Sequence, residues 1–325
     1  MLKHIIVKGN YYSCGRQLGK IMKKSVHHRL NSAFSDSFFR KCRDDLKNIH
    51  ETCDKYYPQY IKQLKGIATG AGVDYWRILL LNSPELRESR SGCTSIAKSI
   101  KGKVELFHNE DGWGGERIKD CALVTYKYKH MTIHAFIYAG FLPGYAYSWN
   151  SKGTYFSVNY LIPINLKPLS HVPRHFSACA LTEARNIKDA SRILRVSPDA
   201  SGFHYYFGFQ NEMLSIEQFH DKLSVKKIKG IDLHTNHYLH EFFGKKIPTD
   251  KNSIIRNKRG RDLIKKHTES LSILSDRNNP PNAICGKFGE KLHTLSTVHF
   301  SPLENKVTIY SPHTNKKIYE LKLKN

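Results

Sequence analysis

The chain has 325 residues, 40% of them hydrophobic and 11% aromatic, and its formal net charge is +24 at pH 7. This composition excludes a disordered chain and allows a large core in one or two domains. The basic residues are scattered, and the densest runs, at positions 226–229 and 256–261, are short. The charge therefore favours a solvated surface, with a nucleic-acid or anionic-surface partner as the alternative.

The cysteine pattern and the hydropathy bear on the compartment. There are seven cysteines and no Cys-X-X-Cys pair, which favours free thiols in a reducing compartment over a disulfide framework. The N-terminus lacks the apolar run of a signal peptide. The stretch from Met131 to Tyr147 is interrupted by His134 and Pro143, and it is shorter than the ~20 residues of a membrane span. We therefore expect a cytoplasmic protein without a membrane span.

The first ninety residues predict helices. Apolar residues recur at helical spacing at Leu18, Ile21, Met22, Val26 and Leu30. A second helix is expected from Pro58 to the glycines at 70 and 72, and a third from Asp74 as N-cap to about Leu81.

After Cys93 the pattern changes to strands. Val124, Tyr126 and Tyr128 alternate with polar residues, and a second strand is expected at 133–137. Three further strands are predicted at 293–300, 306–311 and 317–323, and two helical stretches at 179–196 and 253–268. Strands joined by short turns favour antiparallel sheets with helices on their outer faces, an α+β fold.

Four polar segments follow one another along the chain. Gly92-Cys93-Thr94-Ser95 stands at the boundary between helices and strands, and Asp111 ends an Asn-Glu-Asp triplet 18 positions later. Asn150 precedes Ser-Lys-Gly, and Asn236 lies within His-Thr-Asn-His. Taken singly, each is more typical of a buried structural cysteine or a turn residue than of a catalytic group.

Taken in order, these segments resemble the acyltransferase-like branch of the N-terminal-nucleophile (Ntn) hydrolases. That branch includes isopenicillin N acyltransferase and the hydrolases of beta-alanyl amines, with bile-salt and penicillin V amidases as more distant relatives. The resemblance begins with Gly9-Asn10-Tyr11-Tyr12-Ser13-Cys14-Gly15-Arg16-Gln17-Leu18-Gly19. It implies a four-layer αββα sandwich with an N-terminal helical segment, in a single domain over residues 1–325.

The resemblance also implies a role for each motif residue. The chain would cut itself between Gly92 and Cys93 into segments 1–92 and 93–325, which stay associated. Cys93 would be the nucleophile of an amidase or acyltransferase, and it would carry an acyl-thioester formed from a small-molecule amide or acyl substrate. Asp111 would orient the new N-terminus, and Asn236 would bind the oxyanion with Asn150 nearby. A late arginine near the substrate is also typical of the family, but no motif places it.

The chemistry fits these residue types. A free thiol has a pKa of ~8.5 and a new α-amine on the same residue a pKa of ~8, so the amine can serve as the base. An asparagine amide can donate to an oxyanion. A glycine before the nucleophile would ease a bent backbone.

Other kinds of site are weighed against this one. His234, His237 and His240 suggest a metal, but no His-Glu-X-X-His motif is present, and on a strand His237 would face away from the other two. The glycines at 112–115 do not have the spacing of a phosphate loop. Tyr126-Lys127-Tyr128-Lys129 could stack on bases in a nucleic-acid binder built on an inactive scaffold. We expect no metal, no cofactor and no specific nucleic-acid partner.

Overall fold

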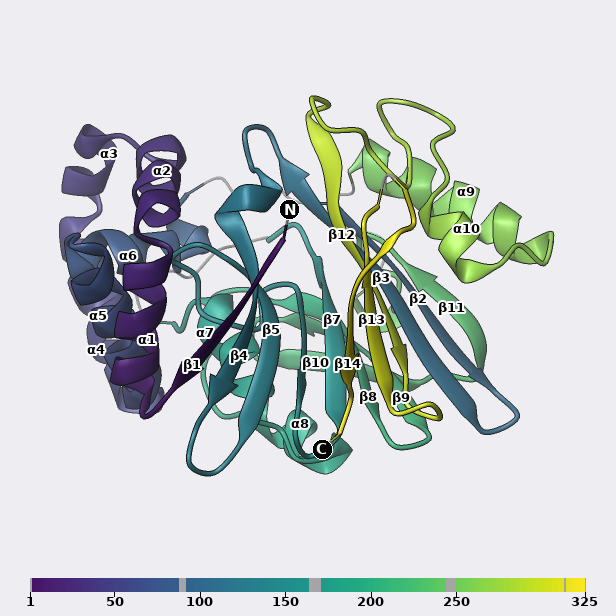
Figure 1. Cartoon of the computed structure of the whole chain (residues 1–325), viewed down its shortest axis with the longest axis horizontal. Coiled ribbons are helices and arrows are strands. Elements are labelled where there is room, and N and C mark those ends of the chain that lie inside the picture. The colour runs from purple at the N-terminus through teal and green to yellow at the C-terminus, as the bar shows by residue number, and fades with distance from the viewer. Residues whose placement is uncertain (1, 88–91, 164–170, 244–249, 313, 325) are drawn as a thin grey trace. The chain divides into compact units, whose positions relative to one another are not determined.

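The structure is a computed structural model that describes residues 2–87, 92–163, 171–243, 250–312 and 314–324 (Figure 1). The chain forms two compact units, and each is described by itself. The first comprises Met1–Ser89, Ile118–Asn150 and Asn165–Ser201, and the second comprises Arg90–Arg117, Ser151–Ile164 and Gly202–Asn325. The first unit thus takes residues from both sides of the expected cleavage point.

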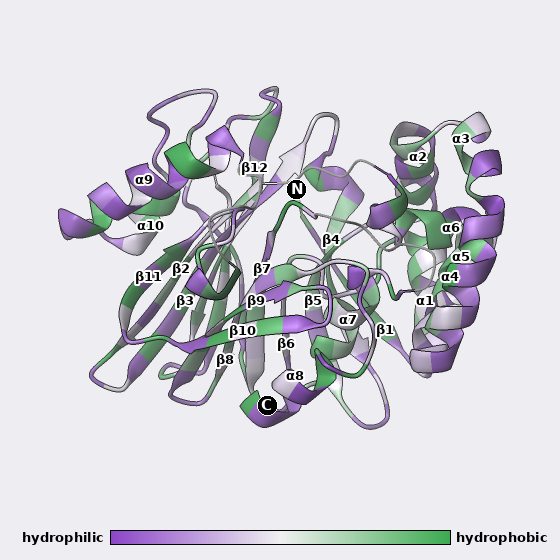
Figure 2. Ribbon diagram, turned by 180° about the vertical axis from the view of Figure 1, so that it is seen from behind, coloured by the Kyte–Doolittle hydropathy of each residue, from purple (hydrophilic) through white to green (hydrophobic). Residues whose placement is uncertain are grey.

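The N-terminal half of the first unit is helical, as predicted. Its helices are α1 (Tyr11–Ile21), α2 (Lys23–Ala33), α3 (Asp36–Lys41), α4 (Arg43–Tyr56), α5 (Pro58–Ala71) and α6 (Tyr75–Leu81). Figure 2 shows hydrophilic and hydrophobic residues side by side on these helices, as expected for helices with one buried face. Pro58 begins α5, and the Asp74 side chain caps α6 by accepting from the Trp76 N–H.

One helical prediction is wrong in detail. The helix expected to run through Met22 is interrupted there, where α1 ends and α2 begins. Ile21 is 55% exposed and does not join the buried face. The backbone at Met22 (φ −98°, ψ 17°) departs from helical values, which rotates the faces of the two helices relative to each other.

The first unit also contains strands. A strand that the sequence analysis did not predict, β1 (Lys3–Lys8), pairs in parallel with β4 (Cys121–Lys127). The others are β5 (Thr132–Tyr138) and β6 (Tyr147–Asn150), and two short helices, α7 (Arg174–Leu181) and α8 (Ile187–Ile193), replace the single stretch expected at 179–196. Tyr126 and Tyr128 are buried, so they are not available to stack on nucleic-acid bases.

The second unit contains two antiparallel sheets with helices on one side. One sheet has the order β11 (Gly230–His234), β2 (Gly92–Ile100), β3 (Lys103–Trp113), β12 (Leu292–Ser301), β13 (Lys306–Tyr310) and β14 (Lys317–Lys322). Facing it are β7 (Thr154–Tyr160), β8 (Phe203–Phe209), β9 (Glu212–Phe219) and β10 (Lys222–Lys227). The helices α9 (Lys251–Lys265) and α10 (Ser270–Leu274) cover the other face of the first sheet (Figure 1).

The core between these helices and the sheet is apolar. It consists of Ile96, Phe107, Leu233, Ile273, Leu274 and Ile284. The second unit thus has a helix layer, a sheet and a second sheet, and the predicted α+β fold with antiparallel sheets and outer helices is confirmed. All seven cysteines are buried free thiols. In the described parts of the chain, no helix has the length and apolar character that a membrane crossing requires.

Candidate active site

Cys93 is the second residue of β2, and the pairing of β2 with β3 determines its neighbours. Cys93 lies opposite Glu110, and Ser95 lies opposite His108. Because side chains alternate between the two faces of a sheet, these four share the face that lies toward the second sheet. Asp111, one position further along β3, belongs to the opposite face, which α9 and α10 cover.

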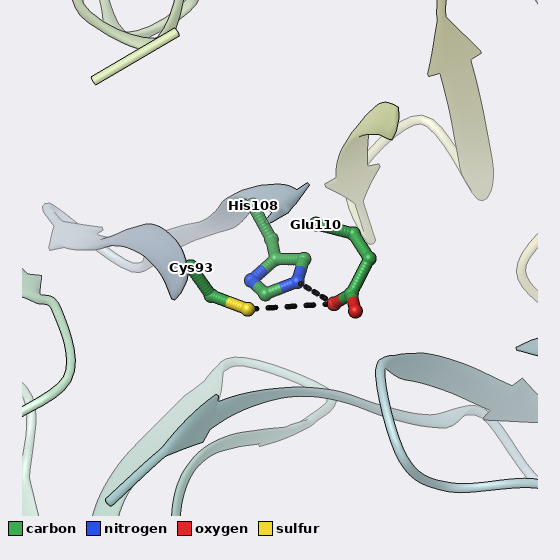
Figure 3. Close-up of side chains that lie close together, drawn as sticks. All are labelled: Cys93, His108 and Glu110. Carbon is green, nitrogen blue, oxygen red and sulfur yellow. Dashed lines mark hydrogen bonds and ion pairs between the residues drawn. The ribbon is translucent and has the colours of Figure 1, made fainter. Parts of the chain in front are cut away.

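The thiol lies in a closed polar cluster with His108 and Glu110 (Figure 3). Cys93 Sγ donates to Glu110 Oε2 at 3.5 Å, and His108 Nε2 lies 3.1 Å from the same oxygen. All three side chains are at most 2% exposed. Burial, followed by the negative charges of Glu110 and Asp111, raises the pKa of the Cys93 thiol well above its usual value. The thiol of the intact chain is therefore protonated at neutral pH.

The other nitrogen of His108 contacts a serine. His108 Nδ1 lies 2.8 Å from Ser95 Oγ, and Ser95 donates its only hydroxyl proton to Asn159 Oδ1 at 2.7 Å. Ser95 must therefore accept from Nδ1–H, which leaves a lone pair on Nε2 of the neutral ring. Burial lowers the pKa of His108 to about 3, so the ring is neutral.

The backbone of Cys93 is bound on both sides by Asn236 and Arg256. The Cys93 N–H donates to Asn236 Oδ1 at 2.9 Å, and Arg256 donates to the Cys93 carbonyl oxygen at 2.8 Å. Arg256 also donates to Asn236 Oδ1 at 2.6 Å and to Thr94 Oγ1 at 2.9 Å. Asn236 Nδ2 donates one hydrogen to the Tyr160 carbonyl at 3.0 Å. The predicted nucleophile and the predicted oxyanion residue are thus in direct contact.

Asp111 is buried near this group. Burial raises its pKa to about 7, while the Arg256 charge and a hydrogen bond from Thr294 oppose the rise. Asp111 lies opposite Gly92 in the β2–β3 ladder, so it flanks the bond that joins Gly92 to Cys93. Its predicted orienting role requires the strand end that cleavage would create, and it stays a prediction.

The comparisons with known proteins identify the family. A family model described as "Acyl-coenzyme A:6-aminopenicillanic acid acyl-transferase" matches residues 100–316, about two thirds of the chain. The chain belongs to this acyltransferase family. The match begins after Cys93 and includes Asp111, Asn150, Asn236 and Arg256.

Individual relatives carry related descriptions. The chain is 31% identical over 219 residues to the "Beta-alanyl-dopamine/carcinine hydrolase" of Drosophila melanogaster, which covers 59% of this chain and 56% of that protein. The chain thus spans little more than half the length of this relative. A solved structure of a mutant conjugated bile acid hydrolase from Clostridium perfringens is 12% identical and covers 71% of this chain and 92% of its own, with a TM-score of 0.43.

Arg256 is a site residue that the sequence analysis did not single out for this acyltransferase-family chain. It lies in α9, within one of the basic runs, and is fully buried although it carries a charge. The buried positions of α9 are Ser253, Arg256, Asn257 and Gly260. A helix whose buried stripe is small and polar, 20 positions after Asn236, is a signal that could have revealed it.

Asn150 is placed differently from the other predicted site residues. It ends β6 in the first unit, and its Nδ2 donates to the carbonyl oxygens of Thr182 (2.9 Å) and Ala184 (2.8 Å). Both amide hydrogens are therefore used to hold the segment after α7. For this reason we do not include the Asn150 side chain in the proposed oxyanion site.

Gly92 lies in a tightly packed strand and not in the bent backbone that was expected. It begins β2 as an ordinary strand residue. A Cβ atom at this position would lie 2.6 Å from both terminal methyl groups of Leu292. A larger residue would therefore have to push the Leu292 side chain aside, next to the bond between Gly92 and Cys93.

Two groups were considered as metal sites. In the described residues, Cys93, His108 and Glu110 form a set whose ligand atoms all lie within 4.8 Å of one another. The thiol donates to Glu110, and His108 Nε2 lies 3.1 Å from the same carboxylate oxygen. We assign none of the three as a metal ligand. His234, His237 and His240 bond separately, to Glu217, Ser253 and Ser215. The expectation of no metal or cofactor stays a prediction.

Proposed function

We propose that this chain is a cysteine-nucleophile amidase or acyltransferase, activated by cleavage of its own Gly92–Cys93 bond. The observation that carries the proposal is the set of polar contacts that Cys93 makes. Asn236 and Arg256 bind its backbone N–H and carbonyl, while its thiol contacts a buried carboxylate. A cysteine that only filled space in the core would not need two buried polar side chains to position its backbone.

Cleavage would convert the Cys93 nitrogen into a primary amine. This amine, with a pKa of ~8, would take the thiol proton, so that Sγ can attack the amide carbonyl of a substrate. The amine portion of the substrate would leave with a proton, and the acyl group would stay on Sγ as a thioester. Water or a second amine would then release it, giving hydrolysis or acyl transfer.

The oxyanion of this reaction needs a fixed donor. Asn236 Nδ2 carries two hydrogens, and one is held by the Tyr160 carbonyl. The second is suited to donate to the substrate oxygen, because Arg256 and Cys93 fix the carbonyl end of the same amide. Arg256 supplies a positive charge beside the nucleophile. Burial lowers the pKa of its guanidinium, and the nearby Asp111 carboxyl opposes that fall.

For the substrate, we propose a small linear amide. The Drosophila relative is described as a hydrolase of beta-alanyl-dopamine and carcinine, and the family description names an acyl-coenzyme A donor. Beta-alanyl amides of amines that carry an aromatic ring on an alkyl chain, such as dopamine, are therefore the first compounds to test, followed by acyl-coenzyme A with amine acceptors.

The test combines intact mass and a substrate panel on the purified full chain. We expect pieces of 92 and 233 residues (325 − 92 = 233) and amine release from at least one amide. Cys93→Ala should remain one piece without activity. Cys53→Ala, which alters another buried free cysteine, should behave as wild type. An uncut wild-type chain that hydrolyses amides would contradict the proposed activation.

A further inference from the structure

Self-cleavage has a requirement that turnover does not have. While Cys93 is joined to Gly92, its nitrogen is an amide that donates to Asn236 Oδ1, and it has no lone pair with which to act as a base. The thiol proton must therefore go to another group before or during the attack on the Gly92 carbonyl. That group must already lie within hydrogen-bond reach of Sγ in the intact chain.

We propose that Glu110, paired with His108, takes the thiol proton of Cys93 during self-cleavage and returns it to the departing Cys93 nitrogen. This inference rests on the proposed cleavage between Gly92 and Cys93 and assigns the base for that step. It concerns maturation, and the α-amine takes over as base for turnover.

The position of Glu110 supports this role. Its Oε2 already accepts from Sγ at 3.5 Å, and the register of β2 against β3 places the two residues directly opposite each other. Both are buried, so bulk water is excluded from the contact. Asp111 belongs to the opposite face of the sheet, which makes it less suited to receive this proton.

His108 makes this carboxylate a better base. An ordinary glutamate, with a pKa of ~4.3, is poorly matched to the Cys93 thiol, whose pKa burial raises well above the usual ~8.5. The lone pair of His108 Nε2 faces the same Oε2 at 3.1 Å, because Ser95 and Asn159 fix the hydrogen of the ring on Nδ1. Two acceptors at this distance repel each other, whereas a protonated carboxyl could donate to Nε2. The contact therefore favours uptake of a proton by Glu110.

The step balances in atoms and protons. Sγ bonds to the Gly92 carbonyl carbon as its proton moves to Glu110. The carbon–nitrogen bond then breaks as that proton passes to the Cys93 nitrogen, which leaves a thioester and a free α-amine. Asn236 Oδ1, which accepted from the amide N–H, can accept from the new amine. Water hydrolyses the thioester, which gives a Gly92 carboxylate and restores the thiol.

The test follows self-cleavage of the full chain over time in a cell-free translation reaction. Glu110→Gln keeps the size of the side chain and removes the base, so cleavage should slow by about 10²-fold or more. Ser95→Ala releases His108 to carry its hydrogen on Nε2, and cleavage should slow by about tenfold. The matched control is Ser157→Ala, which removes a hydroxyl that donates to Ser95 Oγ but leaves the Ser95–Asn159 bond in place, and it should cleave as wild type.

Turnover per cleaved chain separates this role from a structural one. Once Glu110→Gln has matured, its kcat per cleaved molecule should fall by a factor at least about tenfold smaller than that for its cleavage rate, because the α-amine is the base for turnover. Folding is compared between Cys93→Ala and the double variant Cys93→Ala/Glu110→Gln, both of which are uncut, by circular dichroism and thermal unfolding. If wild type is cut and Glu110→Gln is cut at the same rate, or if cleavage and kcat fall equally, the inference is overturned. If wild type is never cut, the failure lies in the proposed activation itself.

Discussion

The Asn236 side chain presents two chemically different atoms. Its Oδ1 accepts from the Cys93 N–H and from Arg256, whereas its Nδ2 is a donor. Positioning the nucleophile and stabilising an oxyanion can therefore be separated by a substitution that keeps one atom type and removes the other. The same side chain would act before cleavage through Oδ1 and during turnover through Nδ2.

Asn236→Asp keeps an acceptor for Cys93 and Arg256 and removes the donor. We expect self-cleavage to proceed, while kcat for an amide substrate falls by about 10²-fold or more with a smaller change in KM. Asn236→Ala removes both functions, so cleavage itself should also slow. Gel analysis of maturation and steady-state kinetics measure the two effects. A folded Asn236→Asp enzyme with wild-type kcat would show that backbone amides, and not Asn236, bind the oxyanion.

Asp111 should make the stability of the intact chain depend on pH. Its folded pKa is raised to about 7 from an ordinary value of 3.8, mainly by burial. Between about pH 4 and pH 7 the folded state thus holds more protons at this site than the unfolded state, so stability falls as pH rises. Asp111→Asn should remove this loss, and the difference should grow across the window to at most about 4 kcal/mol.

The measurement is denaturant unfolding at several pH values in a Cys93→Ala background, where every chain is intact. Asp221→Asn, at an exposed turn between β9 and β10, is the control and should leave the pH dependence unchanged. A constant difference between Asp111→Asn and its parent from pH 4 to pH 8 would contradict the raised pKa.

The sequence reveals some of these residues and not others. Cys93, Asp111 and Asn236 stand in short motifs, and the structure brings Cys93 and Asn236 into contact. Glu110 lies within the Asn-Glu-Asp triplet and His108 directly precedes it, but their role depends on the register of β2 against β3, which is set by long-range pairing. Arg256 reaches the site from a helix that the sequence placed correctly without indicating which face it buries.

At the scale of elements, α1 and α5 pack through glycines. A Cβ atom on Gly15 would lie 2.2 Å from the Gln63 carbonyl oxygen, and one on Gly66 would lie 2.3 Å from the Tyr12 carbonyl oxygen. Gly19 makes an approach as close as these to the backbone of the other helix. The backbones of α1 and α5 are therefore in direct contact at these glycines, where side chains would ordinarily separate two helices. Figure 1 shows the two helices.

Gly66→Ala should therefore destabilise the chain, although alanine favours helix by about 0.5–1 kcal/mol. The clash is with a carbonyl oxygen of the main chain, so the helices must separate, and we expect a net loss of about 1–3 kcal/mol. Thermal unfolding in the Cys93→Ala background measures it. Gly115→Ala, where nothing lies within 4 Å of the added atom, should have little effect. Equal stability of the two variants would show that the helix pair adjusts without cost.

The sequence predicted helices better than strands, and β3 shows why. Helix α5 begins with a proline and has a regular apolar stripe, and helix α6 begins with an aspartate cap. By contrast, residues 108–111 of β3 are all polar and all at most 1% exposed. A strand that is covered on both faces and buries polar groups for chemistry has no alternation of hydrophobicity to detect.

At the scale of the whole chain, the expected cut at 92/93 lies three residues after the first change of compact unit, at 89/90, but it does not divide one unit from the other. Residues from both sides of the cut build the first unit. In this unit β1 pairs in parallel with β4, and Asn82 is buried against residues 140–142. Both contacts join segments that are distant in the sequence, and no local change of composition indicates them. The sequence pattern predicts the helices and strands but not the contacts between segments from the two sides of the expected cut.

Contacts between the two sides of the cut predict that the two pieces stay together after cleavage. β1 gives its backbone hydrogen bonds to β4, and Asn82 donates to the Gly140 carbonyl at 2.8 Å and accepts from the Leu142 N–H at 2.9 Å. Glu183 accepts from the hydroxyls of Tyr11 and Tyr60. Each of these contacts joins residues 1–92 to residues 93–325, and none requires the Gly92–Cys93 bond.

We therefore expect the cleaved protein to elute as one species of both pieces in native size-exclusion chromatography and to give two bands on a denaturing gel. Asn82→Ala removes the buried bonds to Gly140 and Leu142, leaving unpaired groups that cost about 1–3 kcal/mol each, so its pieces should separate at a lower urea concentration. Asn48→Ala, at an exposed position of α4, is the matched control and should separate as wild type does. Because cleavage leaves every one of these contacts in place, separation of the wild-type pieces without denaturant would show that the first unit is not held together by them.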